Sequence, residues 1–292
     1  MLASITNLPQ RRGPGAPSRR PVSPRCRLVH DRPNERLKLF GAQPAHLAEL
    51  PSMRELATWG KVTAYARGGH RHQWEALGFR SEGNIRGFFR DGSDAAIWAA
   101  YPQPQRGHER DKHLHDACLA AAQNKGLLAQ TVLPPGYTSE RVTPHHAAEV
   151  AALMSSVFSV YPTCLSERHI DQLIRSGSSF FRCIRNAEQQ MVAVASAEMD
   201  LIRKNAEMTD CATRPDQRGR GLMAYILRQL EADLNSHYQI VDLYSLARAQ
   251  EVGMNCVFKK LGYSYQGRLI NNCRMPSGWE SMHIWCKRSS DC

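Results

Sequence analysis

A turn rich in arginine and glycine, placed directly before a helical pattern, carries the clearest chemistry in this sequence. Residues 207–227 read EMTDCATRPDQRGRGLMAYIL, so a strand pattern leads through RGRG into an amphipathic pattern that starts at Leu222. Glycines allow the backbone to approach a ligand closely, and the unpaired amides at a helix start attract anions. The segment therefore predicts a pyrophosphate-type site. We expect the anion to be held by Arg218, Gly219, Arg220 and Gly221.

Two other phosphate-binding motifs do not fit this turn. A dinucleotide-binding fingerprint needs GxGxxG within regular βαβ repetition, and a Walker A loop needs GKS or GKT. The sequence has neither. Arginine and glycine tracts also bind RNA, so the four residues alone leave a nucleic-acid function open.

Composition and charge bear on that alternative. The chain has 292 residues, 42% of them apolar, and a formal net charge of +11. Six arginines and no acidic residues lie in the first 30 residues, which leaves +5 for the other 262. The body of the protein is therefore only mildly basic, which disfavours a nucleic-acid-binding module.

The lengths of the apolar runs and the spacing of the cysteines and histidines disfavour a membrane protein, a disulfide framework and a metal site. No apolar run approaches the roughly 20 residues of a membrane span, so we expect no membrane partner. The nine cysteines are odd in number and form no CxxC pair, and the histidines form no HExxH. These patterns predict reduced thiols in a cytoplasm and no metal site.

Helix and strand patterns divide the chain into four segments. Residues 1–27, rich in arginine and proline, predict a disordered tail. Residues 28–126 and 138–288 carry the helix and strand patterns, and the stretch 127–137, with Pro-Pro-Gly, is typical of a linker. In the second half the periodicity predicts helices over 146–158, 166–177 and 222–234, and strands over 180–185, 191–201, 206–213 and 240–247.

A short internal echo links the two halves. WEALGFRSEGNI, at 74–85, matches FKKLGYSYQGRL, at 258–269, with a constant offset of 184. A hairpin rich in aromatic residues follows in both places, and in the first half we expect strands over 61–67, 85–90 and 95–101. The echo predicts two related units. The first is incomplete, because no RGxG-type loop follows a strand there.

These features resemble the GNAT superfamily of acetyl-CoA-dependent N-acetyltransferases. The family's loop, Arg/Gln-x-x-Gly-x-Gly/Ala, is matched by Arg218 and Gly221, with Met223 in place of the last small residue. Its Tyr-x-Lys-x-Gly-Phe helix end is matched by FKKLGY, so Phe258 replaces the tyrosine proposed as general acid. The resemblance implies an α/β (α+β) GNAT fold with a mixed central sheet over 138–288, preceded by an incomplete GNAT-like half. It also implies acetyl-CoA contacts at Cys211, Ala212, Thr213, Leu222, Met223 and Phe258.

A narrower resemblance concerns the acceptor. NAEMTDCATRPDQRGRGLM, ARAQEVGMNCVFKKLGYSYQGRLINN and GWESMHIWCK are similar to the β-lysine N-acetyltransferases, whose N-terminal portion is similar to GFRSEGNIRGFF. This implies acetylation of the side-chain amine of β-lysine, with N6-acetyl-β-lysine, a compatible solute, as the product. Another acceptor, such as a polyamine, an aminoglycoside or a protein lysine, stays open. An acetyl-CoA sensor without turnover also stays open, because Phe258 lacks the tyrosine hydroxyl.

The acceptor's chemistry requires a base. A lysine-type ammonium has a pKa near 10.4, so only about one molecule in 2,500 is neutral at pH 7. Glu207, on the strand entering the turn, resembles the base glutamate of histone-acetylating GNAT members and is the first candidate. Asp210 is the second candidate and, three residues along a strand, is expected on the opposite face. Arg248, after the strand 240–247, is a candidate clamp for the substrate carboxylate.

Overall fold

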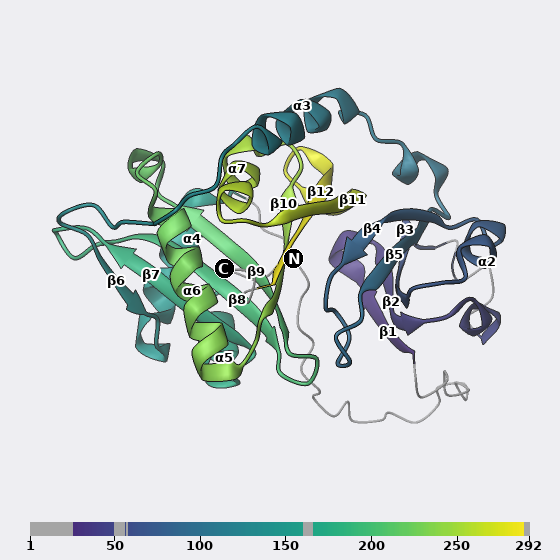
Figure 1. Ribbon diagram of the computed structural model, residues 1–292, viewed down its shortest axis with the longest axis horizontal. Helices are drawn as coiled ribbons and strands as arrows, with labels where there is room; N and C mark the ends of the chain where they lie inside the picture. The colour runs from purple at the N-terminus through teal and green to yellow at the C-terminus, as the bar shows by residue number, and fades with distance from the viewer. Residues whose placement is uncertain (1–25, 50–55, 57, 160–165, 289–292) are drawn as a thin grey trace.

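A mixed sheet of twelve strands runs through the part of the protein that the structure describes (Figure 1). The structure, a computed structural model, describes residues 26–49, 56, 58–159 and 166–288. The strand order is β1-β2-β3-β5-β4-β11-β12-β10-β9-β8-β7-β6, so the two halves of the chain occupy opposite ends of the sheet. The predicted tail, residues 1–27, lies outside the described residues apart from its last two, and Arg27 already belongs to strand β1 (Arg27–Asp31).

The second half is built much as its periodicity predicts. Its strands are β6 (Thr138–Arg141), β7 (Ser179–Arg185), β8 (Met191–Asp200), β9 (Asn205–Thr213), β10 (Asp242–Arg248), β11 (Ser264–Met275) and β12 (Gly278–Arg288). Its helices are α4 (Ala147–Val157), α5 (Glu167–Arg175), α6 (Leu222–Tyr238) and α7 (Val252–Lys260). Strands β9 and β10 are parallel and the other neighbouring strands of this half are antiparallel, which confirms the mixed sheet.

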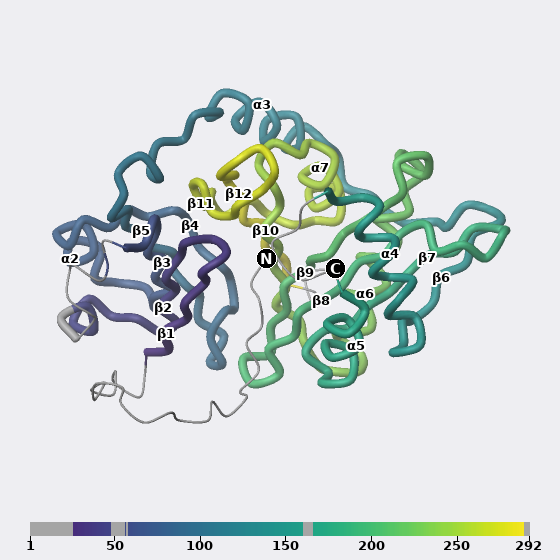
Figure 2. The backbone as a smooth tube through the Cα atoms, turned by 180° about the vertical axis from the view of Figure 1, so that it is seen from behind, coloured from purple at the N-terminus to yellow at the C-terminus, as the bar shows by residue number. Residues whose placement is uncertain are grey.

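Helix α6 covers one face of the sheet at β7–β9, and α4 and α5 cover the other face (Figures 1 and 2). Alternation along β8 produces this arrangement, because Ala193 and Ala195 pack in the core under α6 whereas Val194 packs in the core with α4 and α5. Leu227 of α6 is fully buried in the same core as these alanines. Their small side chains let the helix lie close to the sheet.

The first half repeats part of this arrangement. It contains β1, β2 (Arg36–Ala42), β3 (Lys61–Arg67), β4 (Arg80–Ile85), β5 (Ala95–Ala100), α2 (Arg71–Ala76) and α3 (Lys112–Gln123). Strands β2 and β3 are parallel and their neighbours antiparallel, so β1-β2-β3-β5-β4 has the same order and directions as β8-β9-β10-β12-β11. The strand predicted over 61–67 is confirmed. The one predicted over 85–90 is wrong, because β4 ends at Ile85 and a turn follows, with Gly87 at a φ of +57°.

The two halves meet where β4 pairs with β11, at Gly83 and Gly267. These are the corresponding glycines of the internal echo, and their φ angles are +138° and +144°. A Cβ on Gly83 would clash with the carbonyl of Gln266, and a Cβ on Gly267 would clash with the carbonyl of Glu82. Only glycine therefore allows these strands to cross so closely.

A shared core lies between the halves. Phe40 stacks on Tyr65 and Tyr65 on Phe88, with ring centroids 4.5 and 5.4 Å apart. Phe88 in turn contacts Tyr244 of β10, with centroids 6.2 Å apart. All four belong to one buried cluster that also contains Ile284 of β12. One face of the first half therefore packs against the second half instead of facing solvent.

The predicted linker, residues 127–137, lies along the second half. Leu128 donates its N–H to the carbonyl of Lys260 at 2.8 Å, and Leu133 packs against the core under α6. Just before it, α3 packs against α7 (Figure 1).

The boundaries of the four segments stay a prediction. None of the helices in the described ranges is long and apolar enough to cross a membrane.

Candidate active site

The turn between β9 and α6 has the geometry of an anion site. Gly219 and Gly221 have φ angles of +78° and +77°, and a Cβ at either position would meet no atom within 4 Å. The first hydrogen bond into the helix runs from the N–H of Tyr225 to the carbonyl of Gly221, at 3.1 Å. The amides before it have no acceptor within the helix. Arg218 and Arg220 are exposed beside them, so the turn offers amides and positive charge to a pyrophosphate.

Three of the predicted acetyl-CoA contacts lie in the core and not on the exposed turn. They are Leu222, Met223 and Phe258. All three side chains are buried in the core under α6, with 2%, 8% and 1% exposure. Leu222 and Met223 therefore offer only their backbone amides to a ligand, and a methionine in place of a small residue is accommodated in the core. Phe258 packs edge-on against Tyr263, with ring centroids 5.1 Å apart.

Strands β9 and β10 separate in the middle of the sheet. Their parallel pairing ends at Glu207 and Tyr244, although β9 continues to Thr213 and β10 to Arg248. Beyond that point the facing edges no longer pair with each other. Such an edge fits an extended ligand that adds to the sheet like a strand.

A β-bulge in β9 follows directly. Asp210 and Cys211 together stand opposite Ala195 of β8, and Asp210 has a φ of +50°. Cys211, Ala212 and Thr213 lie on the separated part of β9, where we expect the pantetheine arm. Burial raises the pKa of the Cys211 thiol, which keeps the sulfur protonated and speaks against a nucleophilic role.

Glu207 lies at the point where β9 and β10 separate. Its side chain is 2% exposed, and within the part of the chain that the structure describes, its Oε2 has no hydrogen-bond partner. Burial raises the pKa of this carboxyl group, while the charge of Lys38 and a hydrogen bond with Tyr244 act in the opposite direction. A carboxylate with an unused acceptor atom and a raised pKa is suited to take a proton from an ammonium.

The expectation that Asp210 and Glu207 lie on opposite faces of β9 is wrong. The bulge adds one residue and shifts the alternation. Asp210 accepts a hydrogen bond from the Ser196 hydroxyl at 2.6 Å. Ser196 lies on the same face of β8 as Glu198, which pairs directly with Glu207. Both candidate carboxylates therefore lie on one face, and Glu207 is the one with an oxygen that has no partner in the described part of the chain.

Arg248 is engaged by the protein itself. Its Nε and Nη2 donate to the Glu280 carboxylate at 2.7 and 2.8 Å, and its Nη1 lies 3.1 Å from Glu251. All three guanidinium nitrogens thus face carboxylates of neighbouring segments. This arrangement speaks against the predicted role as a clamp for the substrate carboxylate.

Buried polar residues of the first half, which the sequence analysis did not single out, lie against the second half. Arg36 and Lys38 of β2, with Thr63 and Tyr65 of β3, lie on the face turned toward the second half. Each is at most 1% exposed. The only signal in the sequence is the alternation of charged and apolar residues along RLKLF, which does not say what the charged face meets.

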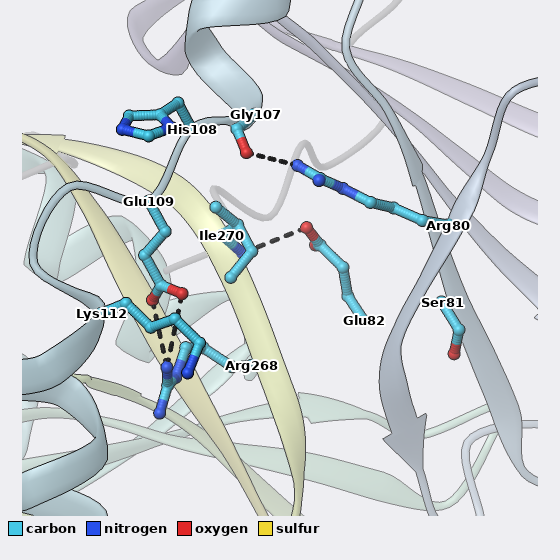
Figure 3. Close-up of a pocket in the computed structure, with 9 residues that line it drawn as sticks. All are labelled: Arg80, Ser81, Glu82, Gly107, His108, Glu109, Lys112, Arg268 and Ile270. Atoms are coloured by element: carbon cyan, nitrogen blue, oxygen red, sulfur yellow. Dashed lines mark hydrogen bonds and ion pairs between the residues drawn. The ribbon is translucent and has the colours of Figure 1, made fainter.

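A separate open cavity of about 530 Å³ lies between β4 and β11 (Figure 3). It is lined by Arg80, Ser81, Glu82, Gly107, His108, Glu109, Lys112, Arg268 and Ile270. Its charged groups already have partners within the protein, since Arg268 lies 3.3 Å from Glu109 and the carboxylate of Glu82 accepts the N–H of Ile270 at 3.1 Å. Neither Glu207 nor the turn before α6 lines it, so this cavity is not the predicted site. Within the described ranges, no cluster of His, Cys, Asp and Glu is placed to hold a metal ion.

Three features together define the class of protein. They are the turn before α6, the separated strands β9 and β10, and the helices around them. A model of the acetyltransferase (GNAT) family matches residues 147–263, which include Glu207 and the whole of α6. The chain belongs to the GNAT family and is an N-acetyltransferase with the GNAT fold.

Relatives of known name extend the similarity into the first half. The β-lysine N(6)-acetyltransferase of Methanosarcina mazei is 33% identical over 250 residues, which cover 78% of this chain and 91% of that protein. The N-acetyltransferase YodP of Bacillus subtilis is 28% identical over 268 residues, covering 89% of this chain and 95% of that protein. Both matches are longer than the segment 138–288. Among solved structures, the spermidine N-acetyltransferase of Vibrio cholerae with CoA and spermine is 11% identical, with a TM-score of 0.47, and covers 54% of this chain and 98% of that one.

Proposed function

We propose that this protein transfers the acetyl group of acetyl-CoA to the side-chain amine of β-lysine, forming N6-acetyl-β-lysine. The observation that carries the proposal is the buried carboxylate of Glu207 at the point where β9 and β10 separate, whose Oε2 has no hydrogen-bond partner among the described residues. The choice of acceptor is supported by the relatives from Methanosarcina mazei and Methanococcus maripaludis, both named β-lysine N(6)-acetyltransferase.

Acetyl-CoA supplies an activated acetyl thioester, and the residues of this chain fit its binding. The exposed amides and arginines of the turn at 218–221 suit the pyrophosphate, since a Cβ at Gly219 or Gly221 would meet open space. The unpaired edge of β9, at Cys211, Ala212 and Thr213, suits the pantetheine arm. This arrangement directs the acetyl group toward Glu207.

Glu207 takes the proton that the acceptor must lose. Neutralising a lysine-type ammonium at pH 7 costs about 4.6 kcal/mol, because its pKa lies roughly 3.4 units higher. Once the proton is on Glu207, the amine nitrogen forms a bond to the acetyl carbon while the carbon–sulfur bond breaks. The nitrogen then loses its second proton to the departing thiolate or to water, which leaves the neutral amide. Phe258 has no hydroxyl to protonate the displaced sulfur. A thiol pKa of about 8.5 makes a thiolate a stable enough leaving group without a dedicated acid.

The charge balance of the product suits a compatible solute. β-Lysine carries two ammonium groups and one carboxylate, and acetylation removes one positive charge. The product is a zwitterion without net charge, which interacts weakly with charged macromolecules. We place the reaction, and the accumulation of its product, in the cytoplasm.

A turnover assay with acetyl-CoA tests the acceptor. Release of free thiol would be followed with β-lysine, α-lysine and spermidine, and β-lysine should show the highest kcat/KM by at least about tenfold, the discrimination expected of well-placed polar contacts. A preference for spermidine would make the enzyme a polyamine acetyltransferase. Binding of acetyl-CoA without turnover of any amine would make the protein a sensor.

A further inference from the structure

Two buried cations of the first half lie on the face turned toward the second half, which carries the proposed base Glu207. Arg36 and Lys38 both contact the carboxylate of Asp31, at 2.7 and 3.0 Å. Arg36 also donates to the side-chain oxygen of Asn272 in β11. One carboxylate is thus shared by two cations, so these three charged side chains carry a net charge of +1 in the interior. Among the described residues, no second carboxylate contacts either cation, which makes this cluster a candidate site for an anion.

Lys38 of the first half and Glu207 of the second half occupy equivalent positions in the parallel strand pair of each half. In the first half, the third residue pair between the parallel strands β2 and β3 is Lys38 with Thr63. In the second half, the third pair between the parallel strands β9 and β10 is Glu207 with Tyr244. Because the strand order of the two halves is the same, equivalent positions carry a lysine in one half and a glutamate in the other.

Aromatic contacts connect these two positions across the boundary between the halves. Tyr65 stacks on Phe88, and Phe88 contacts Tyr244, which forms a hydrogen bond with Glu207. Burial raises the pKa of Glu207, and the positive charge of Lys38 opposes this effect. The two charged groups therefore lie within electrostatic reach of each other.

Two buried hydroxyl groups lie on the same face of the first half. Thr63 and Tyr65 are fully buried, and among the residues that the structure describes, neither the Thr63 Oγ1 nor the Tyr65 hydroxyl has a hydrogen-bond partner. A buried polar group left without a partner is destabilising. With Oε2 of Glu207, these oxygens form a set of unused hydrogen-bonding atoms on the facing surfaces of the two halves.

We propose that the first half binds the carboxylate end of the acceptor, through Lys38 and the hydroxyl of Tyr65, while Glu207 of the second half holds the reacting amine. The inference rests on the proposed function, because β-lysine carries an amine at one end and a carboxylate at the other. A bound carboxylate neutralises the +1 of the cation cluster and gives the Tyr65 hydroxyl an acceptor. Acceptor choice then depends on both halves of the chain.

Lys38→Met tests this with two acceptors. β-Lysine is compared with 1,4-diaminopentane, which is β-lysine without its carboxylate. The KM for β-lysine should rise roughly 10- to 100-fold, the usual loss for a hydrogen-bonded charge pair. Because the charge of Lys38 opposes the raised pKa of Glu207, the two enzymes are compared at a pH above the acidic limbs of their profiles. There the KM for acetyl-CoA should stay unchanged, and kcat/KM for 1,4-diaminopentane should not fall.

The matched control is Lys61→Met. Lys61 is also a fully buried lysine of the first half, but it binds the carboxylate of Glu82 at 2.6 Å and the carbonyl of Ile270 at 2.8 Å. Its loss should affect the two acceptors equally. A second variant, Tyr65→Phe, removes only the unpartnered oxygen, so the unfolding temperature should not fall while the KM for β-lysine rises several-fold.

The outcomes separate the two proposals. A loss confined to β-lysine in Lys38→Met and Tyr65→Phe supports the inference. Equal losses for β-lysine and 1,4-diaminopentane refute it and leave the proposed function intact. A wild-type enzyme that acetylates another amine but not β-lysine refutes the proposed function, and the inference with it.

Discussion

Replacing Glu207 by glutamine removes the proposed base while keeping its shape. The amide oxygen of glutamine still accepts a hydrogen bond from Tyr244, so the change is one of basicity rather than packing. Glu207 lies on β9 before the bulge, whereas the proposed pyrophosphate site lies beyond Thr213. Affinity for acetyl-CoA should therefore be unchanged.

The expected loss follows from the acceptor's pKa. A positioned base contributes roughly 10²–10⁴ in rate, part of the about 4.6 kcal/mol needed to neutralise the ammonium at pH 7. We therefore expect kcat of Glu207→Gln to fall by roughly 10²–10⁴ at pH 7. The variant depends on amine that is already neutral, and that fraction rises about tenfold for each pH unit below 10.4. Its rate should climb accordingly from pH 7 to pH 9.

The pH profile of the wild-type enzyme has a defined sign. A base must be deprotonated to act, so activity falls as the pH falls through the pKa of Glu207. Burial raises that pKa, so the acidic limb should lie above the ordinary value for glutamate, and it should be missing in Glu207→Gln.

Initial rates of thiol release, measured for both enzymes across this pH range, check the argument. The matched control is Glu231→Gln, since Glu231 is also a buried glutamate, but on α6, where it pairs with Lys287 at 2.7 Å. It should lose stability and keep the pH profile. Near-normal turnover of Glu207→Gln at pH 7 would refute the assignment and transfer the role to Asp210 or to a water chain.

Three further predictions concern the glycines and the stoichiometry. Gly221→Glu should abolish acetyl-CoA binding in calorimetry by repelling the pyrophosphate; Gly177→Glu, at a similar φ of +67° in open space, should retain it, and undiminished affinity in Gly221→Glu would place the cofactor elsewhere. Gly83→Ala should lower the free energy of unfolding by about 1–3 kcal/mol through its clash with the facing strand, more than Gly92→Ala, which has room for a Cβ; equal unfolding temperatures would contradict this. Calorimetry should find one acetyl-CoA per chain, because no RGxG-type loop follows a strand in the first half, and two would show a second site.

The second half could be predicted well because its signals are local. The apolar spacing that defines α6, the alternation along β8 and the glycines before α6 all lie within a few residues of the structure they produce. Helix α5 is an example, since the Ser166 hydroxyl accepts the N–H of His169 at 3.3 Å, as expected for a helix cap.

The errors come from effects that local patterns do not contain. The side on which Asp210 lies depends on a one-residue bulge, which shifts every later side chain to the other face. Whether the Arg248 guanidinium group is already paired depends on Glu280, which the fold brings next to it from a distant part of the sequence. The surroundings of Lys38 depend on how the two halves pack, and the internal echo predicts only that the halves are related.

The positive charge of Lys38 and the carboxylate of Glu207 lie in different halves of the chain. An acceptor with a carboxylate at one end and an amine at the other would therefore need both halves. A lysine and a glutamate that contact each other inside one sheet would satisfy each other and leave nothing for a ligand. Here Lys38 contacts Asp31 of its own half, and Oε2 of Glu207 stays unpartnered in the described structure. The close crossing at Gly83 and Gly267 fixes how the two surfaces face each other, because any larger residue would push β4 and β11 apart. The glycine shared by both copies of the echo thus sets the distance between β4 and β11, the two strands that join the halves.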